Sequence, residues 1–391
     1  MPFSMQLIYV AAVCFWLLAS CKPPRATTQI NRAEPWMLPS FIKQDAVNPI
    51  MEADTTAQFE DSILKQQVKW IEKDVFNPAA VVRNDTVFLL FRAEDKIGKY
   101  AGTSRVGLAW SLDGIRFTKH PTPVLYPDND AFKKWEWEGG CEDPRVVQDE
   151  GGTYFMTYSS YDGDKARMMI ASSTDLYHWK KWGRAFEDAT NTKYADGWSK
   201  SGAIVSKYIN GTPVAQKING VYWMYWGDQN IWAATSDDLI HWKPVLYKEG
   251  EQQATNLRGV AKELPEVKTV FGPRTGTFDS DLVEPGPPAL LTDDGILLLY
   301  NSRNIPSIGD TSLPEGTYAA GQILMDKRDP TKVLQRSDSY FIKPDKEYEI
   351  TGQIGRVCFV EGLVHYKNKW FLYYGTADSK IAVTVSDAPI R

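Results

Sequence analysis

The chain has 391 residues, of which 43% are hydrophobic and 13% aromatic, and its formal net charge is −5. This composition excludes an intrinsically disordered chain and is sufficient to bury a sizeable core. Lys and Arg (44) nearly balance Asp and Glu (49), and no basic run is present, which argues against a nucleic acid partner and favours a neutral ligand.

The N-terminus carries an apolar run from Leu7 to Leu18, which is too short to span a bilayer but has the length of a signal-peptide core. The run ends in Leu18-Ala19-Ser20-Cys21, which resembles a bacterial lipobox, although no Lys or Arg precedes it. The resemblance implies a lipoprotein signal peptide over residues 1–21 and a lipid anchor on Cys21 in the cell envelope of a bacterium, either periplasmic or at the cell surface. A plain signal peptide or a buried segment is the alternative.

Residues 22–67 are polar, contain Pro and lack sustained periodicity. We predict that they form a tether followed by an N-terminal segment that lies on the folded domain, which occupies residues 68–391. Apart from Cys21, the mature chain would keep only Cys141 and Cys358, too few for a disulfide framework. We expect these two thiols to be free and buried.

A pattern of short β-rich strands recurs along the domain, and a Ser-x-Asp turn followed by an aromatic residue accompanies it. Its copies begin at Ser111, Ser173 and Ser236, at intervals of 62 and 63 residues. A unit of that size holds one four-stranded antiparallel sheet, and the strands at 296–300 and 370–374 extend the count to five. We therefore predict an all-β fold, a five-bladed β-propeller; a β-sandwich is the alternative.

Propellers bind ligands at the axis, where the first strand of each blade converges. Pro or Gly beside a polar residue at a strand start would hold that side chain near the axis. The chain offers five such starts, at Asn77-Pro78, Glu142-Asp143-Pro144-Arg145, Lys200-Ser201-Gly202, Glu284-Pro285-Gly286-Pro287-Pro288 and Glu361-Gly362.

The segment Gly139-Gly140-Cys141-Glu142-Asp143-Pro144-Arg145 resembles the signature of glycoside hydrolase family 130. Further segments agree with that family in the same order, namely Phe91–Asp95, Val283–Pro288, Asp329–Arg336 and Tyr374–Asp378. The ordered set is far more specific than a lone Glu-Asp-Pro-Arg. Membership of this family implies a five-bladed propeller and activity on β-linked mannose, by hydrolysis or by phosphorolysis.

The same resemblance assigns the general acid to Asp143, which in the family protonates the glycosidic oxygen through a hydroxyl of the bound mannose. A carboxyl group crowded by Glu142 and desolvated by aromatic walls is expected to have a raised pKa and to keep a proton near neutral pH, unless it pairs with Arg145. The alternative is an Asp-Pro turn that only starts a strand.

Phosphorylases of the family place a His-Arg pair after the strand that corresponds to residues 222–225. This chain has Trp226-Gly227-Asp228 there, side chains that cannot hold a phosphate dianion, and Asp228 would repel it. We therefore favour an inverting hydrolase that removes β-linked mannose from mannooligosaccharides or mannan, and β-1,2 over β-1,4 as the linkage. A phosphorylase that releases mannose 1-phosphate is the alternative.

An inverting hydrolase needs a second carboxylate to activate water. We predict Glu284 as this base because two prolines hold its strand start, with Asp228 as the second candidate or as a partner that orients the water. Recognition of sugar hydroxyls without proton transfer is the alternative role for both. Polar groups expected to bind the sugar hydroxyls are Asn77, Arg92, Asp95, Arg145, Lys200, Glu361 and Asp378.

The four His residues, at positions 120, 178, 241 and 365, do not have metal-ligand spacing, and two of them recur as His-Trp in the repeat. We predict packing roles for them and no catalytic metal or other cofactor. A sugar-binding propeller without activity would keep the aromatic residues and lose the acid and base. A sialidase-type propeller would need an arginine cluster that the strand starts do not supply.

Overall fold

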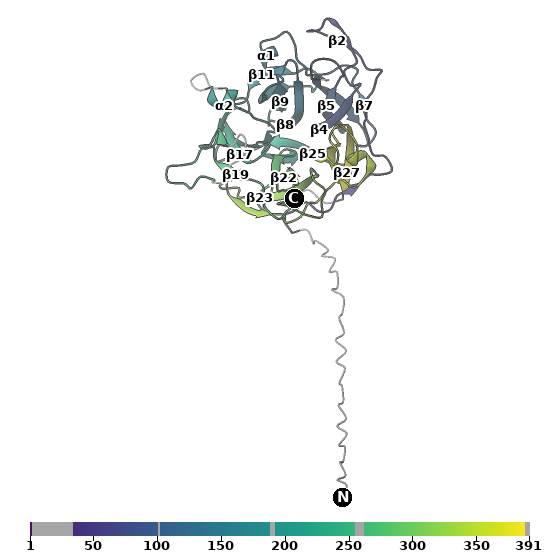
Figure 1. The fold of residues 1–391 in the computed structure, drawn as a ribbon. Coiled ribbons are helices and arrows are strands. Elements are labelled where there is room, and N and C mark those ends of the chain that lie inside the picture. The colour runs from purple at the N-terminus through teal and green to yellow at the C-terminus, as the bar shows by residue number, and fades with distance from the viewer. Residues whose placement is uncertain (2–33, 101, 188–191, 255–261, 388–391) are drawn as a thin grey trace.

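The computed structural model describes residues 1, 34–100, 102–187, 192–254 and 262–387, which form a mostly β fold with three short helices (Figure 1). The helices are α1 (Lys133–Glu136), α2 (Lys193–Asp196) and α3 (Glu347–Ile350). Within the described ranges, no helix has the length and hydropathy to cross a bilayer. The predicted all-β class is confirmed, whereas Cys21 lies outside the described residues.

Most strands belong to five antiparallel units that follow one another along the described chain, here called units 1 to 5. Unit 1 contains β4 (Asp74–Arg83), β5 (Thr86–Glu94), β6 (Ser104–Ser111) and β7 (Thr118–Lys119). Unit 2 contains β8 (Gly140–Gln148), β9 (Tyr154–Tyr161), β10 (Ala166–Ser173) and β11 (Lys180–Arg184). Unit 3 contains β12 (Ala203–Ile204), β15 (Lys217–Ile218), β16 (Val221–Trp226), β17 (Ile231–Ser236), β18 (Trp242–Pro244) and β19 (Thr269–Phe271).

Unit 4 contains β20 (Leu282–Pro285), β21 (Leu290–Leu291), β22 (Ile296–Arg303), β23 (Tyr318–Met325) and β24 (Val333–Arg336). Unit 5 contains β25 (Cys358–Tyr366), β26 (Lys369–Thr376), β27 (Lys380–Ser386) and, from the other end of the chain, β1 (Ile42–Lys43). Two hairpins complete the described strands, β2 (Phe59–Asp61) with β3 (Gln66–Val68), and β13 (Ser206–Ile209) with β14 (Thr212–Ala215). Parallel bridges from β6 to β8, β14 to β8 and β13 to β21 join units 1, 2 and 4 into one large sheet.

The N-terminal segment takes part in the fold well before residue 68. Strand β1 pairs antiparallel with β27, with Ile42 opposite Val385. The backbone N–H of Leu38 donates a hydrogen bond to the side chain of Gln322, and Trp36 and Leu38 are both buried. Residues 36–43 therefore tie the C-terminal unit to the start of the described chain.

The hydrophobic core is divided into clusters that lie between neighbouring units. Apolar faces pack between units 1 and 2, 2 and 3, 3 and 4, and 4 and 5, and a further cluster joins unit 5 to unit 1. The last cluster brings Phe371 and Tyr373 of β26 against Leu89 and Phe91 of β5. Because strands alternate their side chains between two faces, each interior sheet can bury both faces against its neighbours.

The Ser-x-Asp turns have one geometry at their three positions. In unit 2 the Oδ1 atom of Asp175 accepts the backbone N–H groups of Tyr177 and His178, and the Oγ atom of Ser173 accepts that of Leu176. The same bonds recur in the turns that begin at Ser111 and Ser236. The repeat is thus a local side-chain cap that closes the turn after β6, β10 and β17.

Both cysteines of the domain, Cys141 and Cys358, are free and buried, as expected. They begin or nearly begin the first strands of units 2 and 5. Burial raises the pKa of each thiol well above its ordinary value. Both are therefore neutral packing groups.

Candidate active site

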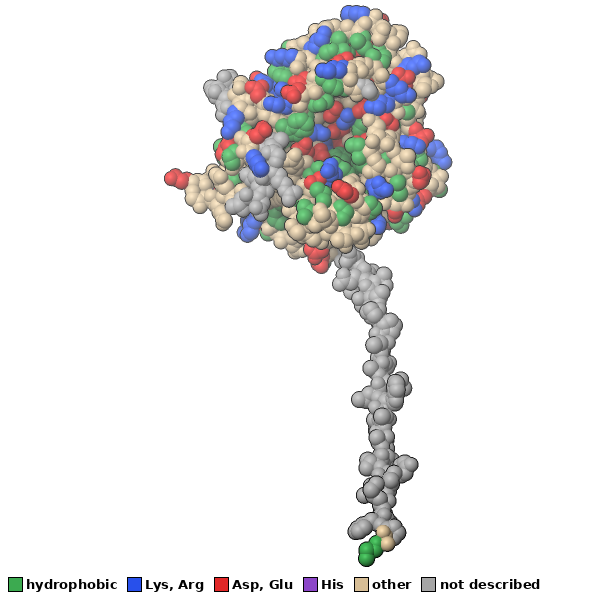
Figure 2. All heavy atoms as spheres, viewed as in Figure 1, with side chains coloured by type: hydrophobic (Ala, Val, Ile, Leu, Met, Phe, Trp, Pro, Cys, Tyr) green, Lys and Arg blue, Asp and Glu red, His purple; other side chains and the backbone are tan. Residues whose placement is uncertain are grey.

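A polar cavity of about 160 Å³ collects most of the predicted site residues. A hollow holding both acidic and basic side chains opens near the middle of the face shown in Figure 2, and the labels of β4, β8, β22 and β25 surround the same region in Figure 1. The residues that line the cavity are Asn77, Arg92, Asp143, Lys200, Glu284, Tyr318, Ile354, Val357, Phe359 and Asp378.

Bulges in the first strands aim the side chains into this cavity. Asn77 and Asp143 have left-handed backbones with a φ of 47° each, and Ser201 has a φ of 59°. The register of β4 against β5 shifts at Asn77, and that of β8 against β9 shifts between Glu142 and Arg145. A left-handed backbone costs free energy outside glycine, and its recurrence at equivalent positions is typical of functional sites.

The carboxylate of Asp143 lies in a ring of donors. The Nδ2 atom of Asn77 donates to its Oδ1 atom at 2.9 Å, and the Nη1 atom of Arg92 lies 3.3 Å from the same oxygen. The Nζ atom of Lys200 lies 3.7 Å from its Oδ2 atom. Burial opposes the ionisation of Asp143, but Arg92, Lys200 and the Asn77 amide outweigh it and lower the pKa to about 2.

The prediction of a raised pKa at Asp143 is therefore wrong for the free protein. Arg145 does not cause the difference by pairing with the carboxylate, because its Nη1 atom donates to the backbone oxygen of Asp143 at 3.3 Å. The neighbour Glu142 takes the raised pKa instead, chiefly through burial, although Arg92 lies 3.0 Å away. In the free protein the raised pKa therefore belongs to Glu142 and not to Asp143.

Glu284 lies on β20 in the wall of the same cavity, and fewer donors compensate its burial than at Asp143. Ser201 donates its hydroxyl to the Oε1 atom of Glu284. Burial raises the pKa of Glu284 to about 7, Asp228 adds to the shift, and Lys200 opposes it. Asp228 is half-buried and outside the cavity wall, and its Oδ2 atom accepts the indole N–H of Trp198 at 2.7 Å. Glu284 thus combines access to the cavity with a pKa near neutrality.

Asp378 is the second cavity carboxyl group whose pKa lies near neutrality. Burial raises its pKa to about 7, and Asp143 and Glu94 add to the shift while Arg92 and Lys200 oppose it. Like its neighbour Ala377, it has a left-handed backbone, with a φ of 49°. Asp378 therefore offers a group that exchanges protons near neutral pH in the wall that Asp143 and Glu284 share.

Arg145 and Glu361 lie in the interior, outside the cavity wall. Arg145 donates from Nε to the carbonyl of Gly286 and from Nη2 to that of Pro285, both at 2.7 Å, which fixes the strand end that carries Glu284. The Oε1 atom of Glu361 is 3.5 Å from Nη1 of Arg145, but among the described residues neither oxygen of Glu361 has a hydrogen-bond partner. Burial raises the pKa of Glu361 well above its ordinary value. Both residues support the site and do not line it.

Asp95 has a different place from the one predicted. Its Oδ2 atom pairs with Nη1 of Arg105 at 2.6 Å, and its Oδ1 atom accepts the backbone N–H groups of Ile97 and Thr103. Arg105 also pairs with Asp61 at 2.8 Å, and all three charged side chains are buried. Asp95 therefore stabilises the fold of unit 1, because its carboxylate has no room for a sugar.

The sequence reading missed several residues around the cavity. Glu94 accepts from Arg92 at 2.7 Å and from Lys73 at 2.8 Å, and it lines an adjoining cavity of about 330 Å³. Alternation along β5 was the available signal, since Arg92 and Glu94 share a face and Asp95 does not. The adjoining cavity is lined by Phe76, Arg92, Glu94, Glu142, Tyr161, Ala166, Trp198, Lys200, Gln353, Ile354 and Asp378. Among the described residues, no group of three or more His, Cys, Asp and Glu side chains is arranged to hold a metal ion.

Comparisons with known proteins identify the family of the chain. A 1,2-beta-oligomannan phosphorylase of Thermoanaerobacter sp. (strain X514) is 29% identical over 333 residues, which cover 82% of this chain and 92% of the relative. The solved structure of a glycosyl hydrolase from Bacteroides ovatus is 41% identical with a TM-score of 0.84, covering 92% of this chain and 97% of the other.

A further solved structure is described by the statement that the GH130 family of mannoside phosphorylases contains glycoside hydrolases that target beta-1,2 mannosidic linkages in Candida mannan. It is 40% identical with a TM-score of 0.85, and the match covers 92% of this chain and 98% of the other. The family model of glycoside hydrolase family 130, described as beta-1,4-mannooligosaccharide phosphorylase, matches residues 41–389. The chain belongs to glycoside hydrolase family 130.

Proposed function

We propose that the protein is an inverting glycoside hydrolase that removes β-linked mannose from mannooligosaccharides or mannan. The observation that carries the proposal is that Asp143 and Glu284 line the same small polar cavity. The cations of that cavity, Arg92 and Lys200, already lie beside the carboxylate of Asp143 and are not free to bind phosphate. Inverting hydrolases need two carboxyl groups on opposite sides of the scissile bond. The similarity to solved structures described as glycoside or glycosyl hydrolases supports the same proposal.

The charges around the cavity argue against phosphate as the attacking group. The guanidinium of Arg92 already contacts Glu94, Glu142 and Asp143. At the position where the family's phosphorylases have a His-Arg pair, Trp226 is buried against other aromatic rings and Asp228 adds a negative charge. A phosphate dianion would thus meet paired cations and repulsive carboxylates.

Glu284 supplies the base in this proposal. With a pKa of about 7, it is substantially ionised at neutral pH and remains a strong enough base to take a proton from water. Ser201 and the strand end held by Arg145 keep the carboxylate in place. We expect Glu284→Gln to lose activity and azide to restore it with a glycosyl azide of inverted configuration as product. Rescue of Asp228→Asn but not of Glu284→Gln would move the base to Asp228.

Asp143 supplies the acid and must gain a proton when sugar binds, because its pKa of about 2 leaves it ionised in the free protein. Glu284 and Asp378, each with a pKa of about 7, hold protons in the same cavity at neutral pH. A sugar that fills the cavity excludes water and competes for the donors on Asn77 and Arg92, and both effects favour a protonated Asp143. The proton then passes through a mannose hydroxyl to the glycosidic oxygen.

The hydrolase and the phosphorylase differ in products that can be measured. We expect turnover to be independent of phosphate and to release free mannose with inverted configuration. Nuclear magnetic resonance of the first product, with and without inorganic phosphate, checks both points. Mannose 1-phosphate as the main product, formed faster as phosphate increases, would establish the alternative function that the 29% identical phosphorylase suggests.

For the linkage we propose β-1,2, supported by the 40% identical structure whose description names β-1,2 linkages in Candida mannan. The cavity beside the catalytic one shares Arg92, Lys200 and Asp378 with it and adds the rings of Tyr161 and Trp198, which suits the sugar on the leaving side. Rates on β-1,2- and β-1,4-mannobiose test the choice, and a higher kcat/KM on the β-1,4 isomer would reverse it.

We also propose that units 1 to 5 are the blades of a five-bladed β-propeller and that Cys21 carries a lipid anchor. The propeller is supported by the cluster that packs unit 5 on unit 1 and by β1, which adds the N-terminal segment to unit 5.

For the anchor, Cys21→Ser should move the protein to the soluble fraction. If that variant still fractionated with the membrane, the proposal of a lipid anchor on Cys21 would be wrong.

A further inference from the structure

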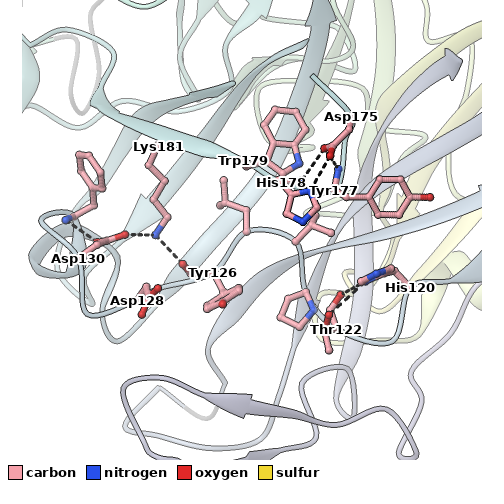
Figure 3. A pocket seen from close by; sticks show the side chains of 14 residues that line it. His120, Thr122, Tyr126, Asp128, Asp130, Asp175, Tyr177, His178, Trp179 and Lys181 are labelled. Carbon is pink, nitrogen blue, oxygen red and sulfur yellow. Dashed lines mark hydrogen bonds and ion pairs between the residues drawn. The ribbon is translucent and has the colours of Figure 1, made fainter. Parts of the chain in front are cut away.

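A second, larger groove lies on units 1 and 2, away from the catalytic cavity. Its volume is about 620 Å³, and we call it the side groove. One wall is the segment from His120 to Phe132, which follows β7, and the other is the Ser-x-Asp turn and start of β11 in unit 2 (Figure 3). The residues that line it are His120, Thr122, Pro123, Val124, Leu125, Tyr126, Asp128, Asp130, Phe132, Asp175, Tyr177, His178, Trp179 and Lys181.

Strand β10 separates the side groove from the catalytic region. Ala166, at the first residue of β10, lines the cavity beside the catalytic one. Ser173, at the last residue, caps the turn that forms the groove wall. Eight extended residues span roughly 25 Å, so the side groove and the cavity beside the catalytic one lie at opposite ends of one strand.

The groove combines ring surfaces with hydrogen-bonding groups. Tyr126, Tyr177 and Trp179 are each half-buried in its wall. Among the described residues, the hydroxyl groups of Tyr126 and Tyr177 have no hydrogen-bond partner, and the side chain of His178 is 90% exposed. The Nδ1 atom of His178 contacts Oδ2 of Asp175 at 2.7 Å. Half-exposed rings beside free tyrosine hydroxyl groups suit the apolar faces and hydroxyls of a sugar chain.

The charges in the groove disfavour an anionic ligand. Lys181 is the cation of the wall, and its Nζ atom already contacts Glu136 at 2.6 Å and Asp130 at 3.0 Å (Figure 3 shows the second contact). Asp128 and Asp175 add two more negative charges. A phosphate or another polyanion would be repelled, whereas hydroxyl groups can donate to these carboxylates.

The repeat provides an internal comparison for the aromatic residues. The equivalent turn of unit 3 has Ile240 and Trp242, and Trp242 is only 3% exposed, inside a core cluster. The turn itself therefore needs neither the tyrosine at 177 nor a solvent-facing ring at 179. Unit 2 differs by presenting both rings to a groove.

We propose that the side groove is an accessory binding site for a neutral polysaccharide chain. The identity of that chain as β-mannan rests on the proposed function, since the groove chemistry itself specifies neutral sugars. Occupancy of the groove holds the polymer on the protein while another part of it reaches the catalytic cavity. The site thereby raises the effective concentration of polymeric substrate without touching the scissile bond.

Affinity electrophoresis of full-length protein tests the proposal, with Glu284→Gln as the background so that polymer is not consumed. Candida mannan, which contains β-1,2-mannosidic linkages, is the probe in the gel. Trp179→Ala and Tyr177→Ala should each weaken binding about tenfold, as expected for the loss of a stacking ring. Trp182→Ala is the matched control, because Trp182 is a 39% exposed ring on β11 outside the groove, and it should leave binding unchanged.

Kinetics of the active protein separate the two sites. The groove variants should have a higher KM for mannan and an unchanged kcat/KM for a mannobiose. A decrease in kcat/KM on both substrates would indicate a damaged fold. Tyr177→Phe keeps the ring and removes the hydroxyl, so it should weaken mannan binding less than Tyr177→Ala does, which preserves a test if an alanine variant does not fold. Equal mannan binding by Tyr177→Ala, Trp182→Ala and their parent would overturn the proposal. If no β-mannoside is cleaved, gels with galactan, xylan and β-glucan test the groove independently.

Discussion

Two regions of the molecule bury carboxyl groups in opposite ways. In α3, Glu349 is fully buried, and its carboxylate accepts hydrogen bonds from Lys43 at 2.7 Å, from the Tyr374 hydroxyl at 2.8 Å and from two backbone N–H groups. Unit 2 repeats the arrangement, since Glu136 accepts from Lys181 at 2.6 Å and from the Tyr158 hydroxyl at 2.7 Å. We call these the Glu349 and Glu136 clusters.

The catalytic cavity lacks this saturation. Glu284 has one hydroxyl donor, Glu361 has no hydrogen-bond partner among the described residues, and the pKa values of Glu284 and Asp378 rise to about 7. Of the three carboxyl groups that line the cavity, Asp143 is the one with enough donors to lower its pKa to about 2. The difference teaches that saturated buried carboxylates hold sheets together, while unsaturated ones around a cavity are held ready to exchange protons.

The largest expected effect comes from the catalytic region. Asp143→Asn should lower kcat by about 10²–10⁴-fold on natural mannosides, because the amide keeps the shape but cannot deliver a proton. Its melting temperature should stay close to that of the unchanged protein, since Arg92 and Lys200 retain other carboxylate neighbours. Steady-state kinetics with calorimetry checks both halves. Near-normal turnover would remove Asp143 from the chemistry.

The Glu349 cluster should respond in the opposite sense. Glu349→Gln leaves the Lys43 ammonium without its most buried partner and should cost about 3 kcal/mol of unfolding free energy, with kcat unchanged. Asp345→Asn is the matched control: it removes the half-exposed partner of Lys43 and should cost less than about 1 kcal/mol. Urea unfolding measures both. Equal costs would show that burial does not distinguish the two partners.

The pH dependence of stability sharpens the comparison further. The pKa of Glu284 is raised from 4.5 to about 7, so its proton stabilises the folded state fully below pH 4.5, and that contribution is lost as the pH rises through about 7. Glu284→Gln removes this loss and should be more stable than its parent at pH 8 by up to about 3 kcal/mol. Unfolding at pH 5 and pH 8 gives the difference. A stability gap that does not grow with pH would contradict the raised pKa.

Much of this fold could be predicted from the sequence because its signals are local. The Ser-x-Asp turns are closed by bonds within a few residues, and the strand alternation follows from period-two patterning. Asn77 and Asp143 were found at strand starts for the same reason, as each is followed by a proline. For Cys141 and Cys358 the sequence excluded a disulfide framework but did not decide whether the two thiols pair, and the structure shows that both are free.

The failures came from contacts between side chains that belong to different strands or loops. Asp143 owes its low pKa to Arg92, 51 residues earlier, and to Lys200 on the next unit. Asp95 was assigned to the sugar because its buried partner Arg105 could not be told from a surface arginine by composition. The charges that surround a carboxyl group in such a site come from several strands. Their positions in space cannot be predicted from one sequence, so neither could the pKa of Asp143 or the partner of Asp95.

The smallest expected effect concerns the tyrosines that complete the clusters. Tyr374→Phe removes a buried donor to the carboxylate of Glu349 and should cost about 2 kcal/mol, because hydrogen bonds to charged groups are stronger than those between neutral groups. Tyr225→Phe is the matched control, since its equally buried hydroxyl donates at the same distance of 2.8 Å to a neutral acceptor, the carbonyl of Pro330, and should cost about 1 kcal/mol. Urea unfolding at fixed pH measures both. If Tyr225→Phe cost as much unfolding free energy as Tyr374→Phe, the charge of the acceptor would make no difference. The hydrogen bond from Tyr374 to the Glu349 carboxylate would then contribute no more than a bond to a neutral carbonyl.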